Sequence, residues 1–347
     1  MISRKKTKTI NIGTVAIGGN NPIAVQSMTK TFTSNVAETV KQIKRLEEAG
    51  CQIVRCAVPD TESAYAIDKI KKKIRLPLVA DIHFDYKLAI IAAEMGADKL
   101  RINPGNIGSL EKIKAVVSAA KERGIPIRVG VNSGSLEKKY KHPTAKALVE
   151  SALSNVRILE KLGFYNIIVA VKSTSVPVTI EAYRLLSQKV DYPLHIGVTE
   201  SGIPKIGTIK SSVGIGALLA EGIGNTLRVS LTGDPVEEVR VGYEILKALE
   251  LVKKGVTIIS CPTCGRCKTQ MEKVVSEIER KTRDIIKPLK IAIMGCEVNG
   301  PGEAKDADVG LAGGNGSGLI FVKGKIVKKV PESRMTSALL EEIRRLI

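Results

Sequence analysis

Residues 94–105 read Glu94-Met-Gly-Ala-Asp-Lys-Leu-Arg-Ile-Asn-Pro-Gly105, and they contain the phrase that the first two thirds of the chain repeats. A helical pattern stops at Gly96, an apolar strand follows at residues 99–102, and polar and turn-forming residues come directly after the strand. Glycine often follows a helix because it adopts the left-handed conformation without a steric penalty. The phrase therefore predicts strands that alternate with helices, as in a parallel sheet.

Eight strands of this kind precede residue 231, and glycine stops such as Gly50, Gly124, Gly163 and Gly222 separate them. We expect the strands at residues 23–26, 52–56, 77–82, 99–102, 126–131, 166–171, 193–198 and 226–230. Eight alternating units are the number that closes a β/α barrel of the TIM type. An open doubly wound sheet is the alternative, but the even spacing of the units favours closure.

The repeat ends after Pro235, and the rest of the chain predicts a second, smaller α/β domain. We expect a strand at 256–260, a helix that runs to residue 287, a strand at 290–294, a glycine-rich stretch at 310–318, a hairpin at 320–329 and a final helix. The length of 347 residues suits two domains better than one. We assign residues 1–254 to the barrel and residues 255–347 to the second domain.

The chain is strongly basic: 54 Lys and Arg against 35 Asp and Glu give a formal net charge of +19. Such a charge favours acidic partners. Nucleic acid is one candidate, but aromatic residues make up only 3% of the chain and stacking platforms for bases are scarce. We find no signal peptide and no stretch long enough to span a membrane, so we expect a cytoplasmic protein. Six cysteines in a reducing compartment indicate metal or redox chemistry.

Four of the six cysteines form a cluster in the second domain. Cys261, Cys264 and Cys267 are spaced as C-x-x-C-x-x-C, and Cys296 follows the next expected strand. Zinc sites usually have two compact pairs of ligands, whereas here the second half holds a single cysteine, so the pattern favours an iron–sulfur cluster over zinc. On spacing alone Cys267 is the fourth ligand, and Glu303 is the other candidate. Cys51 and Cys56, at a barrel strand, read as buried apolar residues.

Polar and basic residues gather at the expected carboxyl ends of the barrel strands, where barrel enzymes place their active sites. Arg or Lys stands at five of the eight ends, and buried cations without partners are costly, so an anionic ligand is expected. Several cations with amide and hydroxyl donors suit a diphosphate. Glu200 follows the seventh strand as a candidate proton donor. The candidate binding residues of the barrel are Arg55, Asp81, His83, Arg101, Asn103, Arg128, Asn132, Lys172, Arg228 and Ser230.

These motifs together resemble the 4-hydroxy-3-methylbut-2-enyl diphosphate synthase family of the non-mevalonate isoprenoid pathway, in its bacterial two-domain form. The resemblance runs almost end to end. It is carried by Val25-Gln-Ser-Met28, Ala80-Asp-Ile-His83, Arg101-Ile-Asn-Pro-Gly-Asn-Ile-Gly108, Gly130-Val-Asn-Ser-Gly-Ser-Leu-Glu137, His195-Ile-Gly-Val-Thr-Glu200, Cys261-Pro-Thr-Cys-Gly-Arg266, Gly295-Cys296 and Asn299-Gly-Pro-Gly-Glu303.

The resemblance implies an activity, a cofactor and partners. The family reductively opens 2-C-methyl-D-erythritol 2,4-cyclodiphosphate and removes a hydroxyl as water, with electrons from ferredoxin or flavodoxin. A 4Fe–4S cluster is held by three cysteines and a glutamate, here Cys261, Cys264, Cys296 and Glu303, and the weak carboxylate ligand leaves one iron open to substrate. Asn299 is the remaining expected substrate contact. The family is a homodimer whose sites use both chains.

Two other classes of protein stay open on the residues alone. One is another iron–sulfur barrel enzyme that acts on a small polyanion. The other is a zinc-containing nucleic-acid binder, which the net charge of +19 motivates. The presence of zinc instead of iron would identify the nucleic-acid binder. Turnover of the cyclic diphosphate would separate the resembled family from another iron–sulfur barrel enzyme.

Overall fold

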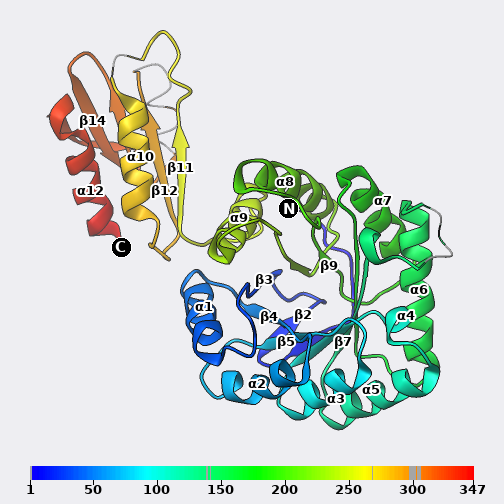
Figure 1. The fold of residues 1–347 in the computed structure, drawn as a ribbon. Helices are drawn as coiled ribbons and strands as arrows, with labels where there is room; N and C mark the ends of the chain where they lie inside the picture. Colours follow the sequence, from blue (N-terminus) through cyan, green and yellow to red (C-terminus); the bar gives the residue numbers. More distant parts are fainter. Residues whose placement is uncertain (1, 138–139, 141, 268, 297–301, 303–305) are drawn as a thin grey trace. The chain divides into compact units, whose positions relative to one another are not determined.

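A computed structural model of the chain describes residues 2–137, 140, 142–267, 269–296, 302 and 306–347. It divides into two compact units, Met1–Leu251 and Val252–Ile347, each with its own sheet (Figure 1). No helix in these described ranges is long and apolar enough to cross a membrane.

The first unit is the expected TIM-type barrel. Its eight strands are all parallel, and a bridge between Val169 and Leu194 joins the two ends of the ladder, so the sheet closes on itself. The strands are β3 (Ala24–Met28), β4 (Ile53–Ala57), β5 (Leu78–Asp81), β6 (Lys99–Ile102), β7 (Ile127–Asn132), β8 (Ile167–Lys172), β9 (His195–Ile196) and β10 (Thr226–Leu227). β9 and β10 are shorter than expected, because the residues that follow them leave the ladder and line the mouth of the barrel.

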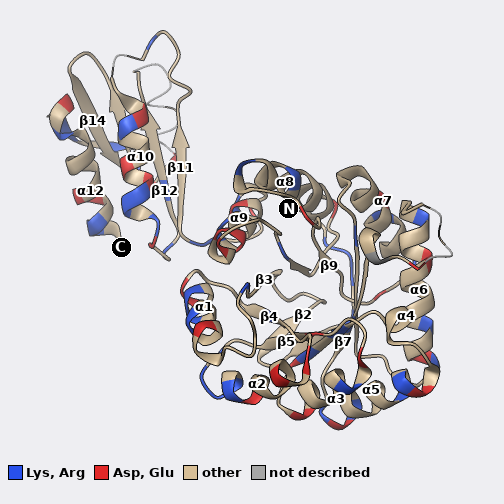
Figure 2. Ribbon diagram, in the orientation of Figure 1, with Lys and Arg blue, Asp and Glu red and all other residues tan. Residues whose placement is uncertain are grey.

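Helices form the outer layer of the barrel (Figure 1). They are α1 (Val36–Glu48), α2 (Thr61–Lys71), α3 (Tyr86–Glu94), α4 (Pro104–Ile107), α5 (Leu110–Glu122), α6 (Ala145–Lys161), α7 (Val176–Ser187), α8 (Pro204–Ala220) and α9 (Pro235–Ala248). Basic and acidic residues are interspersed on helices such as α1 and α9 (Figure 2). On these helices, basic residues thus have acidic residues nearby along the ribbon.

A hairpin that the sequence analysis missed closes the amino end of the barrel. Strands β1 (Ile10–Ile12) and β2 (Val15–Ile17) pair antiparallel. Their buried isoleucines pack against apolar residues at the starts of β3, β4, β5 and β8. The lumen is therefore filled at this end, and polar residues are left for the opposite, carboxyl end.

The second unit is a five-stranded sheet in the order β11-β12-β13-β14-β15. Its strands are β11 (Val256–Ser260), β12 (Leu289–Met294), β13 (Val309–Gly313), β14 (Ser317–Val322) and β15 (Lys325–Pro331). The first three are parallel, and β14 and β15 complete the sheet antiparallel. Helices α10 (Met271–Thr282) and α12 (Met335–Leu346) pack on one core with residues of β12, β13 and β14.

The glycine-rich stretch at residues 310–318 is part of this sheet. It forms most of β13 and the start of β14. A Cβ atom on Gly310 would lie 2.2 Å from Phe321 Cζ and 2.3 Å from the Ala292 carbonyl oxygen. Close packing of the neighbouring strands therefore requires glycine here, although glycine weakens the strand signal in the sequence.

Two glycines of the barrel helix α8 provide a matched test of whether close packing requires glycine. A Cβ atom on Gly214 would lie 2.6 Å from Val198 Cγ2, whereas a Cβ atom on Gly216 would have no neighbour within 4 Å. Gly214→Ala should lower stability by about 1–3 kcal/mol, because overpacking outweighs the gain in helix propensity. Gly216→Ala should raise it by up to about 1 kcal/mol. Thermal unfolding midpoints of the two variants check this, and equal shifts would contradict it.

Candidate active site

The carboxyl end of the barrel holds a small polar cavity. The space between its lining atoms measures about 310 Å³, and part of this space is open to solvent. Strands β4, β6, β7 and β8 and the segments after β9 and β10 contribute to it. Its lining residues are Arg55, Arg101, Arg128, Gly130, Asn132, Ala170, Lys172, Thr199, Arg228 and Ser230.

Arg101 is held by the strands on both sides of β6. Its Nη1 donates to Asp81 Oδ1 at 3.1 Å, and its Nη2 donates to the Gly130 carbonyl oxygen at 3.2 Å. A Cβ atom on Gly130 would lie 2.8 Å from Arg101 Nε, so this glycine leaves the room that the guanidinium occupies. Lys99, two residues earlier on the same side of the strand, is fully buried and donates to Gln26 Oε1 at 3.1 Å.

Arg128 is almost completely buried, with 2% of its surface exposed. Its Nε and Nη1 are buried and have no hydrogen-bond partner among the described residues. Burial, followed by the neighbouring Arg55 and Arg101, lowers the pKa of Arg128 well below its usual value. A buried guanidinium with free donors is a ready binding group for an oxyanion.

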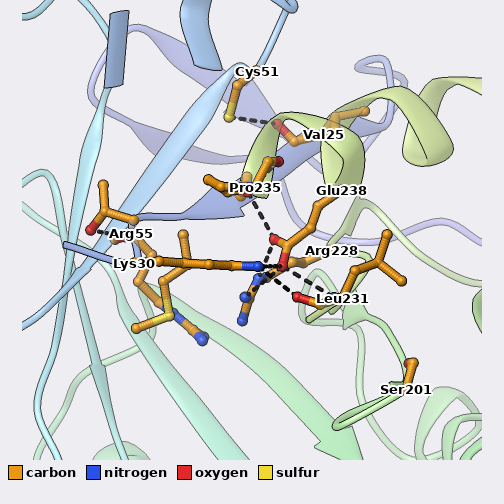
Figure 3. Close-up of polar contacts among 12 residues, drawn as sticks. Val25, Lys30, Cys51, Arg55, Ser201, Arg228, Leu231, Pro235 and Glu238 are labelled. Carbon is orange, nitrogen blue, oxygen red and sulfur yellow. Dashed lines mark hydrogen bonds and ion pairs between the residues drawn. The ribbon is translucent and has the colours of Figure 1, made fainter. Parts of the chain in front are cut away.

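Glu238, a buried carboxylate of α9, pairs with Arg228 in the segment after β10 (Figure 3). Glu238 accepts hydrogen bonds from Ser27 Oγ at 2.9 Å and from Arg228 Nε at 3.2 Å. Lys30 Nζ lies 3.3 Å from the same carboxylate and also donates to the Leu231 carbonyl oxygen. The sequence analysis missed Glu238 and Lys30, because an acidic residue in the first turn of a helix is ordinary there.

Positive charge exceeds negative charge at the mouth. Five cations line the cavity, and two carboxylates, Asp81 and Glu238, are paired with three of them. Burial alone would raise the pKa of Asp81, but Arg55, His83 and Arg101 outweigh it and hold that pKa well below its usual range. Arg128 and Lys172 have no carboxylate partner within the described ranges. The mouth therefore favours a ligand with several negative charges.

The remaining predicted barrel residues belong to the barrel strands or to the segments that follow them. His83 is about half exposed, and its Nε2 lies 3.0 Å from Arg101 Nη1. Asn103 is buried; its Oδ1 accepts from the Gly105 amide, and its Nδ2 has no partner among described residues. Asn132 and Ser230 line the cavity. Glu200 is exposed, has a left-handed φ of 53°, and follows Thr199, which does line the cavity.

Two cysteines of the second unit lie where β11 and β12 end. These strands are parallel neighbours, and Cys261 and Cys296 follow them. The Gly295 amide donates to Cys261 Sγ at 3.1 Å. A Cβ atom on Gly295 would lie 2.4 Å from Cys267 Sγ and 3.2 Å from Cys261 Sγ, so the absent side chain leaves space for sulfur.

Cys264 and Cys267 differ in their surroundings. Cys264 is exposed. Cys267 packs against the core of the unit, and its Sγ donates to the Thr269 carbonyl oxygen at 3.3 Å. Glu303 and Asn299 lie outside the described residues. Across the described ranges, no three Cys, His, Asp or Glu side chains already form a metal-binding group.

The residues present nevertheless fit an iron–sulfur cluster. Thiolates are the ligands such clusters use, and backbone amides directed at sulfur stabilise them. The Gly295 amide already makes such a contact with Cys261. The barrel cysteines do not share these features, since burial raises the pKa of Cys51 to about 12 and that of Cys56 to about 11.

Two family descriptions match the chain. Residues 7–243 match the GcpE TIM-barrel domain, and residues 257–345 match the GcpE protein C-terminal domain. A protein of Caldanaerobacter subterraneus subsp. tengcongensis is 64% identical over 99% of this chain and 98% of its own length. One of Geobacter sulfurreducens is 57% identical over 99% of both chains. Both are named "4-hydroxy-3-methylbut-2-en-1-yl diphosphate synthase (flavodoxin)".

Solved structures share the barrel fold at low sequence identity. Dihydropteroate synthase from Stenotrophomonas maltophilia aligns with a TM-score of 0.54 and 15% identity, over 71% of this chain and 99% of its own. N-acetylneuraminic acid synthetase from Leptospira borgpetersenii aligns with a TM-score of 0.50 and 14% identity, over 81% and 99%. At such identities the likeness concerns the fold alone.

The excess of buried positive charge predicts opposite effects of Arg128→Met on binding and stability. Binding of inorganic diphosphate should weaken by about 1.5–3 kcal/mol, because a charge-assisted contact is lost. The free protein should be as stable as the parent or more stable, because an apolar side chain replaces an unpaired buried charge. Calorimetric titration and thermal unfolding measure both effects.

Arg184→Met is the matched control, since Arg184 is an exposed residue of α7 paired with Glu221. It should change neither measurement appreciably. If Arg128→Met binds diphosphate like the parent protein, the mouth is not the diphosphate site.

Proposed function

The chain belongs to the GcpE family of 4-hydroxy-3-methylbut-2-en-1-yl diphosphate synthases, and from this membership we propose that it converts 2-C-methyl-D-erythritol 2,4-cyclodiphosphate to 4-hydroxy-3-methylbut-2-enyl diphosphate. The reaction opens the ring and removes a hydroxyl as water, so it consumes two electrons and belongs to isoprenoid precursor synthesis. The observation that supports it most directly is the excess of buried positive charge at the barrel mouth.

We assign binding of the diphosphate to the cations of the mouth. Arg128 offers free buried donors, and Arg101 and Arg228 are held in place by carboxylates behind them. Asn132, Ser230 and Thr199 supply neutral hydrogen-bonding groups at the same cavity. Asp81, His83 and Asn103 surround Arg101 or follow its strand, and we infer that they shape the rim. Asn299 would contact the substrate from the second unit.

We propose that the second unit carries a 4Fe–4S cluster held by Cys261, Cys264, Cys296 and Glu303. When bound, the cluster would supply electrons one at a time and an iron that accepts a substrate oxygen. The hydrogen bond that Cys267 Sγ donates to the Thr269 carbonyl oxygen supports assigning the fourth ligand elsewhere. The Gly295 amide would stabilise the reduced state through its contact with Cys261 sulfur.

We propose flavodoxin as the electron donor, as the names of the relatives state for those proteins, with ferredoxin as the alternative. No cysteine lines the described part of the mouth, so the cluster has to come from a second unit. A homodimer whose chains complete each other's sites would provide it, and sedimentation analysis tests the assembly. A reducing compartment, which we take to be the cytoplasm, would keep the six thiols free.

Anaerobic purification with metal analysis and turnover of the cyclic diphosphate tests this function. The parent protein should contain about four iron and four sulfide per chain and should turn over with reduced flavodoxin. Cys264→Ser should lose iron and turnover. The neighbouring Cys267→Ser is the matched control and should keep both nearly intact. Glu303→Ala should lose turnover whether or not the cluster survives.

Three results would contradict parts of this proposal. A colourless protein that contains zinc would favour the nucleic-acid binder. A cluster with no activity on the cyclic diphosphate would favour a different iron–sulfur barrel enzyme. An essential Cys267 together with a dispensable Glu303 would show that four cysteines hold the cluster.

We also propose that Glu200 takes part in proton delivery to the leaving hydroxyl. It follows a residue of the cavity and has a backbone conformation that non-glycine residues rarely adopt. Glu200→Gln keeps the shape and removes the acid, so kcat should fall by about 10²–10⁴-fold. Glu221→Gln, at an exposed carboxylate of the α8 C-terminus, should leave kcat unchanged. Near-normal turnover of Glu200→Gln would limit Glu200 to a structural role.

A further inference from the structure

Three buried polar side chains form a row across the neighbouring strands β8, β9 and β10. Lys172 Nζ lies 3.3 Å from His195 Nε2, and His195 Nδ1 lies 2.7 Å from Thr226 Oγ1. His195 and Thr226 are fully buried and stand side by side in the register of β9 and β10. Only Lys172 reaches the cavity, so His195 contacts the ligand space through Lys172 alone.

The surroundings hold this row in place. Tyr183 donates from its hydroxyl to the His195 carbonyl oxygen at 2.6 Å. A Cβ atom on Gly197 would lie 2.7 Å from Lys172 Nζ and 2.4 Å from the Arg228 carbonyl oxygen. Glycine at this position therefore leaves the space in which the lysine head lies.

The charged groups that face Lys172 and His195 are positive. They are Arg55, Lys99, Arg101, Arg128 and Arg228. The two carboxylates of the mouth, Asp81 and Glu238, form their ion pairs with arginines and Lys30. Within the described ranges, the hydrogen bond that Lys172 makes with its side chain goes to an imidazole rather than to a carboxylate.

The row can satisfy its hydrogen bonds in two protonation states. If Lys172 is an ammonium, it donates to Nε2 of a neutral His195, whose Nδ1–H donates to Thr226 Oγ1. If Lys172 is an uncharged amine, Nε2–H donates to it, and the Thr226 hydroxyl donates to Nδ1. The second state holds one proton fewer, and neither state leaves a ring nitrogen unpaired. A change of tautomer thus follows the charge of Lys172.

The electrostatic environment makes the Lys172 ammonium easier to deprotonate while the mouth is empty. Burial, followed by Arg128 and the other arginines, lowers the pKa of Lys172 well below its usual value. Burial and then Lys172 lower the pKa of His195 in the same direction, so its ring is neutral. A bound diphosphate adds negative charge beside Lys172 and must raise the pKa of the lysine.

We propose that His195 is a positioning residue that lets Lys172 gain a proton when a diphosphate enters the mouth, so that ligand binding takes up a proton at this pair. The inference rests on the diphosphate site proposed above. It adds that the ligand increases the positive charge at this position. Affinity should then fall as the pH rises from the pKa of free Lys172 through the higher pKa of the complex.

Titration calorimetry of inorganic diphosphate tests the proposal. The full chain, purified anaerobically, is titrated at several pH values in two buffers of different ionisation enthalpy, which gives the number of protons taken up. Lys172→Arg is the matched variant, because arginine stays charged while the protonation of the ligand itself is unchanged. The parent should take up more protons than Lys172→Arg, and its Kd should rise more steeply with pH, up to about tenfold per unit for one linked proton.

Variants of His195 test whether the pH dependence of binding comes from the row of Lys172, His195 and Thr226. His195→Leu removes the acceptor of the ammonium, so binding should weaken at a lower pH than in the parent. His195→Gln should restore most of the parent profile, because an amide can accept or donate after a flip. His142→Leu removes an exposed histidine and should behave like the parent.

Each outcome decides one claim. Equal proton uptake by the parent and Lys172→Arg overturns the inference and leaves the diphosphate site standing. If Lys172→Arg loses binding through its bulk, the histidine variants decide, and a parent-like pH profile of His195→Leu overturns the inference. If the parent does not bind diphosphate, the proposed site and the inference both fail.

Discussion

Buried positive charge without enough negative charge is the constraint on which the barrel depends. Arg101 and Arg228 are fixed by Asp81 and Glu238, but Arg128 and Lys172 lack carboxylate partners in the described residues. Such an arrangement costs stability in the free protein. The strands of a closed barrel can hold these groups at short distances because the sheet resists relaxation. A polyanion then finds donors that are already oriented, and less of its binding energy is lost in arranging them.

The second unit solves a different physical problem. The sulfur atoms of Cys261 and Cys267 both lie close to Gly295, and the absence of a side chain at this position leaves space for them. The parallel pairing of β11 and β12 places two cysteine segments at adjacent strand ends. The cations of the cavity and the cysteines Cys261, Cys264, Cys267 and Cys296 thus belong to separate units with separate cores.

The barrel was predictable from the sequence because its signal repeats. Glycine stops and β-branched runs located every barrel strand, and the bounds of β6 were predicted without error. The β1–β2 hairpin escaped notice because three-residue strands carry almost no periodicity. The basic and amide residues at strand ends could be chosen from position alone. Glu238, Lys30 and Lys99 could not, because their roles depend on contacts between segments far apart in the chain.

The hairpin at the amino end has a kinetic consequence. Because its isoleucines fill that end of the lumen, molecules reach the cations through the carboxyl end in the part of the chain that the structure describes. Arrival and departure therefore share one passage, and a departing product that keeps its diphosphate would vacate the donors that we propose for the diphosphate of the next molecule. The next molecule can therefore bind only after the previous one has left. At high product concentration, the exchange of product for substrate, rather than bond breaking, would limit the turnover rate.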